Sequence, residues 1–176
     1  MSESEGLEST ATGAASDWLG MARAASTELN GSDVEAEMLR ELLVIGLNDS
    51  PYAIAVEHVR EIVRMRPLTR VPRAPDWMLG VIALRGEVVE VVDLRRRLGV
   101  DSVEPDRSSR IIVLHGDGER VTGILVDSVK DVFRVSEEAV LEAEDFEFSS
   151  VVGMCQRGDE FISILDVDRL LGFSNE

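Results

Sequence analysis

Two related copies of one sequence pattern, in residues 80–99 and 153–172, constrain the fold of this chain more than any other feature. The copies align without a gap and match Gly80 to Gly153, so that the offset between them is 73 residues. Self-similarity at a fixed offset is the signature of a repeated structural unit. We therefore expect the chain to be internally duplicated.

A second pair of matched segments supports the duplication. Residues 56–64 and 126–134 share charge types and apolar positions at an offset of 70 residues. In the first half, strands are expected at 42–47 and 52–55, followed by a short amphipathic turn or helix over 56–64. Chance similarity between short β-rich segments is the alternative. Two matched pairs in the same order favour two small β subdomains with a shared core.

Each twenty-residue copy predicts a hairpin followed by a short helix. In the first copy, the apolar run 79–84 ends at Arg85 and Gly86, and a second run follows over 87–92. This pattern is typical of a β-hairpin with glycine in its turn. In both copies an aspartate then stands at the expected helix N-cap, and a glycine at the expected C-cap. These capping residues are Asp93 with Gly99 and Asp166 with Gly172.

Composition excludes several classes of partner. The chain has 176 residues and 34 acidic against 18 basic side chains, which gives a net charge of −16. Sequence-independent binding to nucleic acid or anionic lipid is therefore disfavoured. No apolar run is long enough to cross a membrane, and the start of the chain lacks a signal-peptide pattern, so we expect a cytoplasmic protein without direct membrane insertion. The single cysteine, Cys155, excludes an internal disulfide.

The chain divides into an acidic tail and a folded domain. Residues 1–38 are rich in Ser, Glu, Ala and Gly and are expected to be largely disordered, with a short helix allowed at 17–29. That helix would either pack lightly on the domain or dock on a partner. The folded domain is expected to span residues 39–173. Within it, the acidic stretch 137–150 predicts a short helix plus loop, or a mobile excursion.

The sequence holds no recognisable catalytic or metal-binding constellation. It contains two histidines, His58 and His115, and one cysteine, and their spacing fits no familiar metal site. No glycine-rich phosphate loop is present, and the aspartates of the repeated pattern are explained as helix caps. We therefore expect a binding protein that uses no cofactor or metal.

Residues Pro72–Gly99 read Pro-x-x-Pro, then Gly-Val-Ile-x-Leu-Arg-Gly-x-Val-Val-x-Val-Val-Asp-Leu-Arg-x-x-Leu-Gly. This pattern resembles CheW-like domains, the coupling proteins of bacterial chemosensory arrays. The resemblance extends to Tyr52–Ile62, Gly123–Asp127 and Val129–Val132. It implies a mainly β fold, in which two SH3-like five-stranded β-barrels pack together with short helices. It also implies a non-catalytic scaffold between the cytoplasmic tip of a methyl-accepting chemoreceptor and the regulatory domain of a CheA-type histidine kinase, at membrane-associated arrays.

The same resemblance implies a receptor-binding groove between the two barrels. Its expected residues are Val59, Glu61, Ile62, Gly80, Arg85, Ile111, Ile112, Gly123 and Val132. Most of these have a structural alternative. Val59, Ile62 and Val132 could be apolar residues of a barrel lid, Arg85 could be a solvated turn residue, and the two glycines could be turn or packing positions. Ala83 departs from the asparagine that often precedes Leu-Arg-Gly in the family, which concerns the receptor contact at the turn and not the fold.

Two rival functions stay open at the level of sequence. One is an adaptor of a non-flagellar chemosensory pathway that controls twitching, biofilm or second-messenger output. The other is a small β-barrel enzyme, which would need a pocket with paired titratable groups. A nucleic-acid-binding barrel is the least favoured, because the net charge opposes it.

Overall fold

The computed structural model of the chain describes residues 39–115, 121–143 and 150–172. The expected tail 1–38 and its helix lie outside the described residues. Within the described residues, no helix is both long and apolar enough to cross a membrane.

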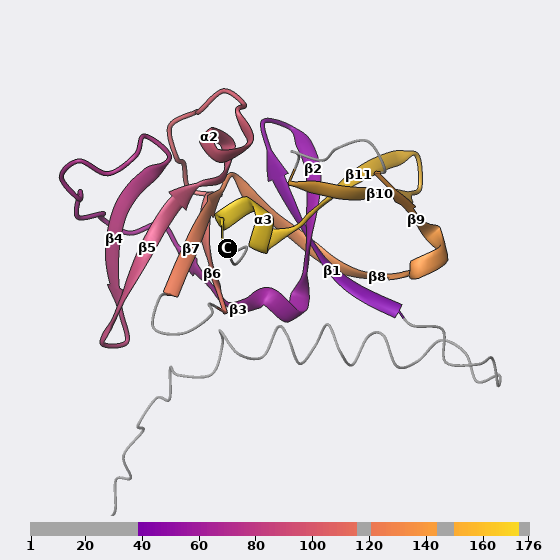
Figure 1. Cartoon of the computed structure of the whole chain (residues 1–176), viewed down its shortest axis with the longest axis horizontal. Coiled ribbons are helices and arrows are strands. Elements are labelled where there is room, and N and C mark those ends of the chain that lie inside the picture. Colours follow the sequence, from indigo (N-terminus) through magenta and orange to yellow (C-terminus); the bar gives the residue numbers. More distant parts are fainter. Residues whose placement is uncertain (1–38, 116–120, 144–149, 173–176) are drawn as a thin grey trace, which may run out of the picture. The chain divides into compact units, whose positions relative to one another are not determined.

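Both halves of the chain contain, in the same order, two paired strands, a third strand, a hairpin and a short α-helix (Figure 1). The 3-10 turn precedes the third strand in the first half, and in the second half it follows the third strand and leads into one additional short strand. The first half holds β1 (Leu39–Leu47), β2 (Ser50–Ala55), the 3-10 turn η1 (Val56–His58), β3 (Val59–Arg64), β4 (Met78–Leu84), β5 (Glu87–Asp93) and α2 (Leu94–Leu98). The second half holds β6 (Arg110–Leu114), β7 (Val121–Val126), β8 (Ser128–Ser136), η2 (Glu137–Ala139), β9 (Val140–Glu142), β10 (Val151–Arg157), β11 (Glu160–Leu165) and α3 (Val167–Leu171). The expected duplication is visible in this order.

The strands form two sheets that exchange strands between the halves. Sheet A has the order β8-β1-β2-β11-β10-β9, and sheet B has the order β3-β6-β7-β5-β4. Each sheet therefore places the hairpin that starts one half between strands of the other half. The parallel pair Val91 with Gly123 in sheet B matches the pair Ile164 with Ala53 in sheet A at the two sequence offsets. The halves are interleaved, and neither can form its sheet alone.

Sheet A contains one strand more than the five that the resemblance implies, and sheet B has a counterpart for it. β9 pairs with β10 through Leu141 and Met154, whereas in sheet B Thr69 forms an isolated bridge to Val81. Val81 and Met154 are matched by the offset of 73 residues. The sixth strand is therefore a longer version of a contact that both sheets make.

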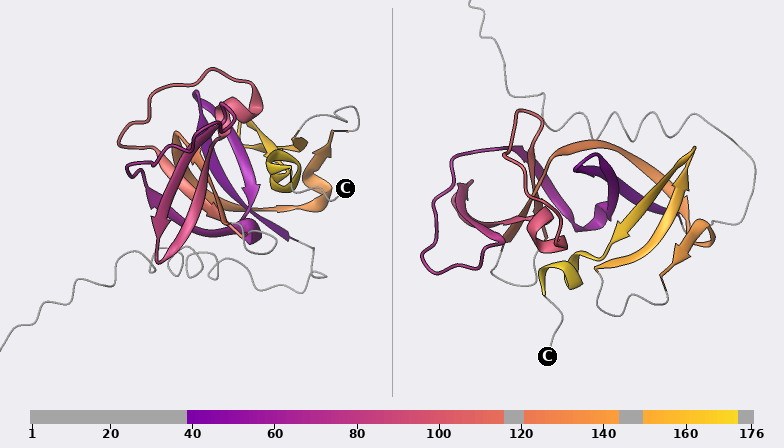
Figure 2. Two further views of the ribbon diagram at one scale, coloured as in Figure 1. Left: turned by 60° about the vertical axis from the view of Figure 1, so that its left-hand side comes forward. Right: turned by 90° about the horizontal axis from the view of Figure 1, so that it is seen from above.

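Three apolar cores hold the two sheets. One core lies within sheet A, around Cys155 and Ile162, and another lies within sheet B, around Val89 and Val113. The third and largest is built from both sheets together with α2 and α3, and we call it the central core. In Figure 2, α2 and α3 lie next to each other at this junction, where Arg97 Nε donates a hydrogen bond to the carbonyl of Leu170. The predicted fold class, mainly β with two SH3-like units, short helices and a shared core, is confirmed.

The segment 56–64 differs from the expected amphipathic turn or helix. Only Val56–His58 forms a 3-10 turn, and the rest is β3, which pairs antiparallel with β6. Two β-branched residues follow one another at the end of this segment, and the exposed backbone of β6 offers them partners, so the strand prevails over the helix. Part of the acidic stretch 137–150 is described, and it forms η2 and β9.

Both predicted pairs of helix caps are confirmed. Asp93 accepts a hydrogen bond from the backbone N–H of Arg95, and Asp166 accepts from the N–H groups of Asp168 and Arg169. Gly99 and Gly172 both end their helices in the left-handed conformation, at φ 72°. A residue with a Cβ would be strained there, which explains the glycine at this position in each copy.

Candidate functional site

Three of the predicted apolar residues lie at the margin of the central core. Val59 and Ile62 on β3 and Val132 on β8 are each partly exposed and pack against it. Val129 on β8 does the same and matches Val59 at the offset of 70 residues, as Val132 matches Ile62. Val129 was not among the predicted site residues. Its match to the predicted Val59 in the duplicated segment could have identified it from the sequence.

The two predicted charged residues contact each other. Arg85 Nη2 lies 3.3 Å from Glu61 Oε2, and the arginine side chain is 77% exposed whereas the glutamate side chain is 20% exposed. Arg85 and Gly86 form the two-residue turn between β4 and β5, and both have positive φ, at 52° and 85°. Arg85 is thus held in a conformation that a residue with a Cβ rarely adopts. We call Val59, Glu61, Ile62, Arg85, Val129 and Val132 together the β3/β8 surface.

The second half contains a related ion pair, in which the carboxylate is matched but the arginine stands one position earlier in its hairpin. Asp131 matches Glu61, and it forms two contacts with Arg157 at the end of the β10–β11 hairpin, with Nη1–Oδ1 at 2.7 Å. The Arg157 guanidinium also stacks over Phe133, 5.5 Å from the ring centroid. Hydrogen bonding from Arg157 lowers the pKa of Asp131, and the same bonds raise the pKa of Arg157. This second arginine is therefore fixed by neighbours within the chain.

The remaining predicted residues lie beneath the surface. The side chains of Ile111 and Ile112 are fully buried, in the core of sheet B and in the central core respectively. A Cβ on Gly123 would lie 2.7 Å from Cγ2 of Ile111, and a Cβ on Gly80 would collide with the backbone carbonyl of Thr69. All four residues shape the sheet, and none of these side-chain positions is open to a partner while the sheet is intact.

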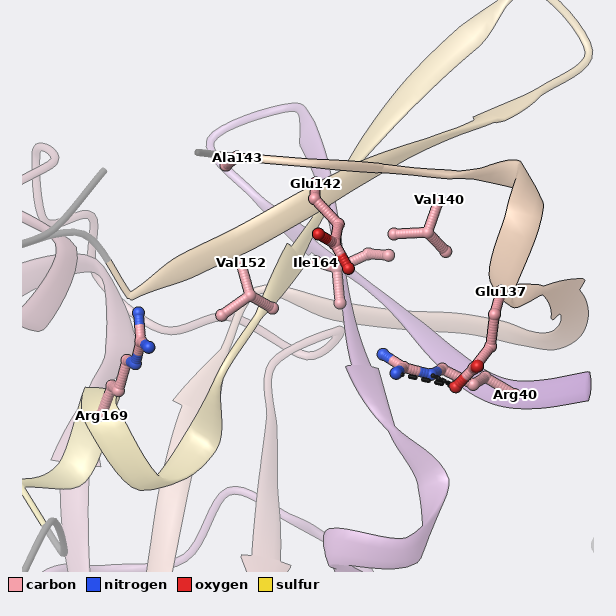
Figure 3. Close-up of a pocket in the computed structure, with 8 residues that line it drawn as sticks. All are labelled: Arg40, Glu137, Val140, Glu142, Ala143, Val152, Ile164 and Arg169. Carbon is pink, nitrogen blue, oxygen red and sulfur yellow. Dashed lines mark hydrogen bonds and ion pairs between the residues drawn. The ribbon is translucent and has the colours of Figure 1, made fainter. Parts of the chain in front are cut away.

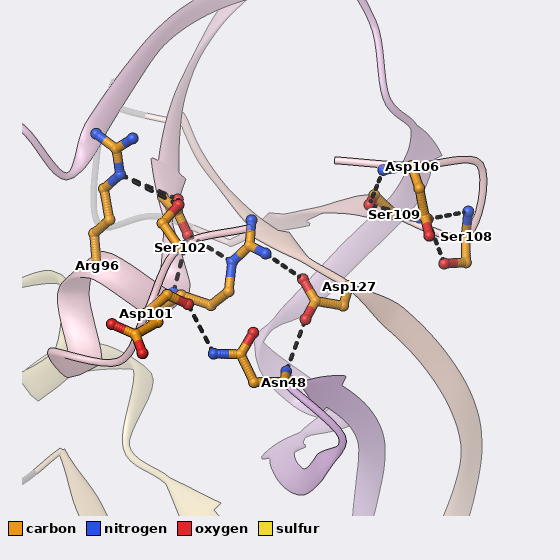
Figure 4. A network of polar contacts seen from close by, with 10 residues as sticks. Asn48, Arg96, Asp101, Ser102, Asp106, Ser108, Ser109 and Asp127 are labelled. Carbon is orange, nitrogen blue, oxygen red and sulfur yellow. Dashed lines mark hydrogen bonds and ion pairs between the residues drawn. The ribbon is translucent and has the colours of Figure 1, made fainter. Parts of the chain in front are cut away.

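A buried ion network joins α2 to the turns of both halves (Figure 4). Arg95 is fully buried, and its guanidinium lies between Asp93 and Asp127, with Nη1 2.9 Å from Asp127 Oδ1. Asp127 also accepts a hydrogen bond from the backbone N–H of Asn48 in the β1–β2 turn. Ser102 donates a hydrogen bond to Asp93 at 2.8 Å. The groups of this network are hydrogen-bond and ion-pair partners of one another, so we interpret the network as structural.

A pocket of about 300 Å³ lies elsewhere, at the β9 end of sheet A (Figure 3). Val140, Val152 and Ile164 form its apolar wall, and Arg40 at its rim is paired with Glu137 at 2.9 Å. None of the predicted site residues lines it. Among the described residues there is also no group of three or more metal-ligating side chains.

Cys155 does not have the environment of a catalytic thiol. It has no exposed surface, it lies in the core of sheet A, and burial raises the pKa of its thiol. Reactive cysteines have lowered pKa values and access to solvent. This cysteine, the only one in the chain, thus offers no arrangement suited to nucleophilic catalysis.

A family model and several curated proteins match this chain, and all of them point to the same family. The model of the CheW-like domain matches residues 41–174. A chemotaxis protein CheW from Rhizobium meliloti is 37% identical over 133 residues, which cover 73% of this chain and 85% of that protein. A chemotaxis protein CheW from Klebsiella aerogenes is 32% identical over 136 residues, covering 75% of this chain and 81% of that protein.

Two further matches extend the comparison. The protein FrzA of Myxococcus xanthus is 28% identical over 142 residues, which cover 78% of this chain and 88% of that protein. The crystal structure of the scaffolding protein TtCheW from Thermoanaerobacter tengcongensis matches with a TM-score of 0.69 and 25% identity, covering 80% of this chain and 93% of that one.

Proposed function

We propose, from the premise that this chain belongs to the CheW-like family, that its β3/β8 surface binds the cytoplasmic tip of a methyl-accepting chemoreceptor. The chain is a chemotaxis coupling adaptor. In the proposal, residues 39–173 are the coupling domain, and a different face holds the regulatory domain of a CheA-type histidine kinase. The adaptor acts without catalysis, in the cytoplasm at receptor arrays.

The observation that carries the proposal is the composition of the β3/β8 surface. Four partly exposed aliphatic side chains border the central core, and a largely exposed arginine contacts Glu61, which lies on the same strand β3. A receptor helix could cover these side chains, and burying one partly exposed valine or isoleucine contributes about 1 kcal/mol. Aliphatic contacts of this kind supply affinity, while a charged neighbour fixes register and orientation.

The buried residues have an indirect part in this proposal. Ile111 and Ile112 lie on β6, the strand next to β3 in sheet B, and they pair with Val63 and Ile62 respectively. They determine the position of the contact residues on β3 without touching the partner. Gly123 allows Ile111 to pack closely against β7, so a larger residue there would move β6 and change the surface indirectly.

The likeness to FrzA favours a second candidate within the same class. That protein is not named as a chemotaxis CheW, and its similarity covers the same region of this chain. An adaptor of a non-flagellar chemosensory pathway would use the same two-partner geometry with a different receptor and kinase. The enzyme alternative has no comparable support, since Cys155 is buried and no described pocket contains the predicted residues.

Calorimetry with two purified partner fragments tests the proposal. The chain is titrated with a receptor-tip fragment and, separately, with the kinase regulatory domain, both from the organism that encodes it. Arg85→Glu reverses the exposed charge, and Arg157→Glu is the matched control at the equivalent hairpin. We expect Arg85→Glu to weaken receptor binding at least about tenfold and to leave kinase binding unchanged.

Two results would contradict the proposed receptor surface. One is unchanged receptor affinity in both Arg85→Glu and Ile62→Glu, which together alter the charged and the aliphatic part of the surface. The other is an equal loss of receptor affinity in Arg85→Glu and in the Arg157→Glu control, which would indicate a general effect of charge. Absence of any binding by the unmodified chain would remove the assignment to these partners.

A further inference from the structure

The segment between β3 and β4 carries a strip of unpaired arginines. Residues 64–73 include four arginines and no acidic residue. All four side chains are exposed, and none forms a hydrogen bond or ion pair with the part of the chain that the structure describes. We call Arg64, Arg66, Arg70 and Arg73 the arginine strip. In a protein with a net charge of −16, such a run without carboxylate neighbours is unusual.

Arg73 has a strained backbone conformation. The N–H of Ala74 donates to the carbonyl of Val71 at 3.4 Å, and this closes a four-residue turn with Pro72 at its second position. Arg73 occupies the third position with φ 61°, where type II turns favour glycine. Residues held in such conformations cluster at sites of function. The strain at Arg73 is thus a second observation, independent of charge.

The strip lies along the outer edge of sheet B. Thr69 pairs with Val81 on the edge strand β4 through two backbone hydrogen bonds, of 2.8 and 2.9 Å. Figure 1 shows this loop beside β4, on the side of sheet B away from sheet A. Leu68 packs against the core of sheet B, whereas Val71 is exposed between two arginines. The edge therefore offers cations that alternate with small apolar groups.

The fold does not require arginines at this edge. The bridge of Thr69 to Val81 is equivalent to the pair Leu141 with Met154 in sheet A. At that equivalent edge, the residue after Leu141 is Glu142, where sheet B has Arg70. One structural position thus tolerates either charge. The bridge to the edge strand therefore does not by itself explain the arginine at position 70.

We propose that the arginine strip is a docking surface for an acidic segment of a partner protein that also carries apolar residues. Exposed guanidinium groups pair with carboxylates, frequently through two hydrogen bonds. The exposed Val71 and Pro72 favour a polypeptide, because a phosphate backbone offers them no apolar contact. The net charge of −16 also repels an extended polyanion or an anionic membrane. This surface extends beyond the proposed receptor contact and does not depend on it.

Peptide binding tests the strip directly. The probe is a synthetic peptide of alternating glutamate and leucine pairs, and its matched control carries glutamine in place of every glutamate. The full chain is compared with a variant in which the strip is neutralised by Arg64→Gln, Arg66→Gln, Arg70→Gln and Arg73→Gln. A charge-matched control chain is neutralised elsewhere, by Arg40→Gln, Arg107→Gln, Arg134→Gln and Arg157→Gln. Circular dichroism confirms that each chain is folded.

We expect the unmodified chain and the control chain to bind the acidic peptide, more weakly as salt is raised, and not the glutamine peptide. The strip variant should bind about tenfold more weakly, because it lacks the four exposed guanidinium groups that pair with the carboxylates of the peptide. Equal binding by the strip variant and the control chain would overturn the proposal. So would absence of acidic-peptide binding by the unmodified chain, or tighter binding to heparin or to phosphatidylserine vesicles than to the peptide.

The outcome can be separated from that of the proposed function. Receptor-tip binding that is lost in Arg85→Glu but kept in the strip variant would support both proposals as independent surfaces. Acidic-peptide binding by a chain that binds no receptor fragment would support the strip alone.

Discussion

Two ion pairs, Glu61 with Arg85 and Asp131 with Arg157, join matched carboxylates to an arginine of a hairpin, and they differ in how tightly each arginine is held. Arg157 makes two short contacts with its carboxylate and stacks on Phe133. Arg85 makes one contact of 3.3 Å, and 77% of its side chain is exposed. Arg157 is thus held by several contacts within the chain, whereas Arg85 has one such contact and a largely exposed side chain.

The two hairpins also differ in the residue that adopts positive φ in the turn. At the offset of 73 residues, Arg85 is matched by Gly158, which has φ 59° and no strain, because glycine adopts positive φ freely. The first half places an arginine where the second half places a glycine. Duplicated units reveal which residues the fold needs, since those recur, and the deviations between the copies mark candidates for function.

The largest expected difference between the copies concerns their short helices. Arg95 on α2 is fully buried between Asp93 and Asp127, whereas the matched residue on α3, Asp168, is exposed. Arg95→Ala removes the buried cation that contacts both Asp93 and Asp127, and leaves Asp93 with only one cation, the partly exposed Arg96 at 3.4 Å. We expect a loss of about 3–5 kcal/mol in the free energy of unfolding. Asp168→Ala should change it by less than about 0.5 kcal/mol. Urea unfolding of both variants measures the difference, and similar values would show that the network does not hold the halves together.

The next largest difference concerns the matched glycines of β4 and β10. Gly80 has φ 146°, and a Cβ there would collide with the carbonyl of Thr69. A Cβ on Gly153 would lie 2.8 Å from the carbonyl oxygen of Leu141, without positive φ. We expect Gly80→Ala to cost about 3 kcal/mol and Gly153→Ala about 1 kcal/mol. Thermal unfolding compares them, and a larger loss for Gly153→Ala would reverse the order predicted from backbone strain.

Local features of the fold could be predicted from the sequence. Helix caps and tight turns depend on neighbouring residues alone, as at Asp93, Asp166 and Arg85. A short polar side chain or a glycine determines the backbone conformation at its own position. The family resemblance supplied the barrels and the candidate residues. Among these, the structure leaves Glu61 and Arg85 at the surface and places Ile111 and Ile112 in the interior.

Features that depend on distant partners could not be predicted in this way. The run at β3 fits a strand or a helix equally well, and its pairing with β6, far along the chain, decides between them. The exchange of strands between the halves leaves no mark on the periodicity of either half. The burial of Arg95 is also invisible in the sequence, where it reads as one of three consecutive exposed arginines.

Exchanging the turn residues of the two copies tests the strain at Arg85. Arg85→Gly removes the cost of positive φ and should stabilise the chain by about 1 kcal/mol, while weakening binding of the receptor-tip fragment. Gly158→Arg should destabilise the chain by a similar amount and leave that binding unchanged. Urea unfolding and calorimetry on the same samples report both quantities. A stabilised Arg85→Gly chain that retains full receptor affinity would identify Arg85 as a turn residue without a role in binding.

The smallest expected effect is the pH dependence of the Asp131–Arg157 pair. Arg157 lowers the pKa of Asp131 from its ordinary value of 3.8, so the pair contributes stability above that pH and loses it as the pH falls through the lower pKa of the folded state. The advantage of the unmodified chain over Asp131→Asn should therefore be constant near neutral pH and disappear in acid below 3.8. Urea midpoints of both chains across this range measure it. If the unmodified chain remained more stable than Asp131→Asn at the lowest pH, Asp131 would stabilise β8 through packing. The ion pair with Asp131 would then not explain why Arg157 is held in place.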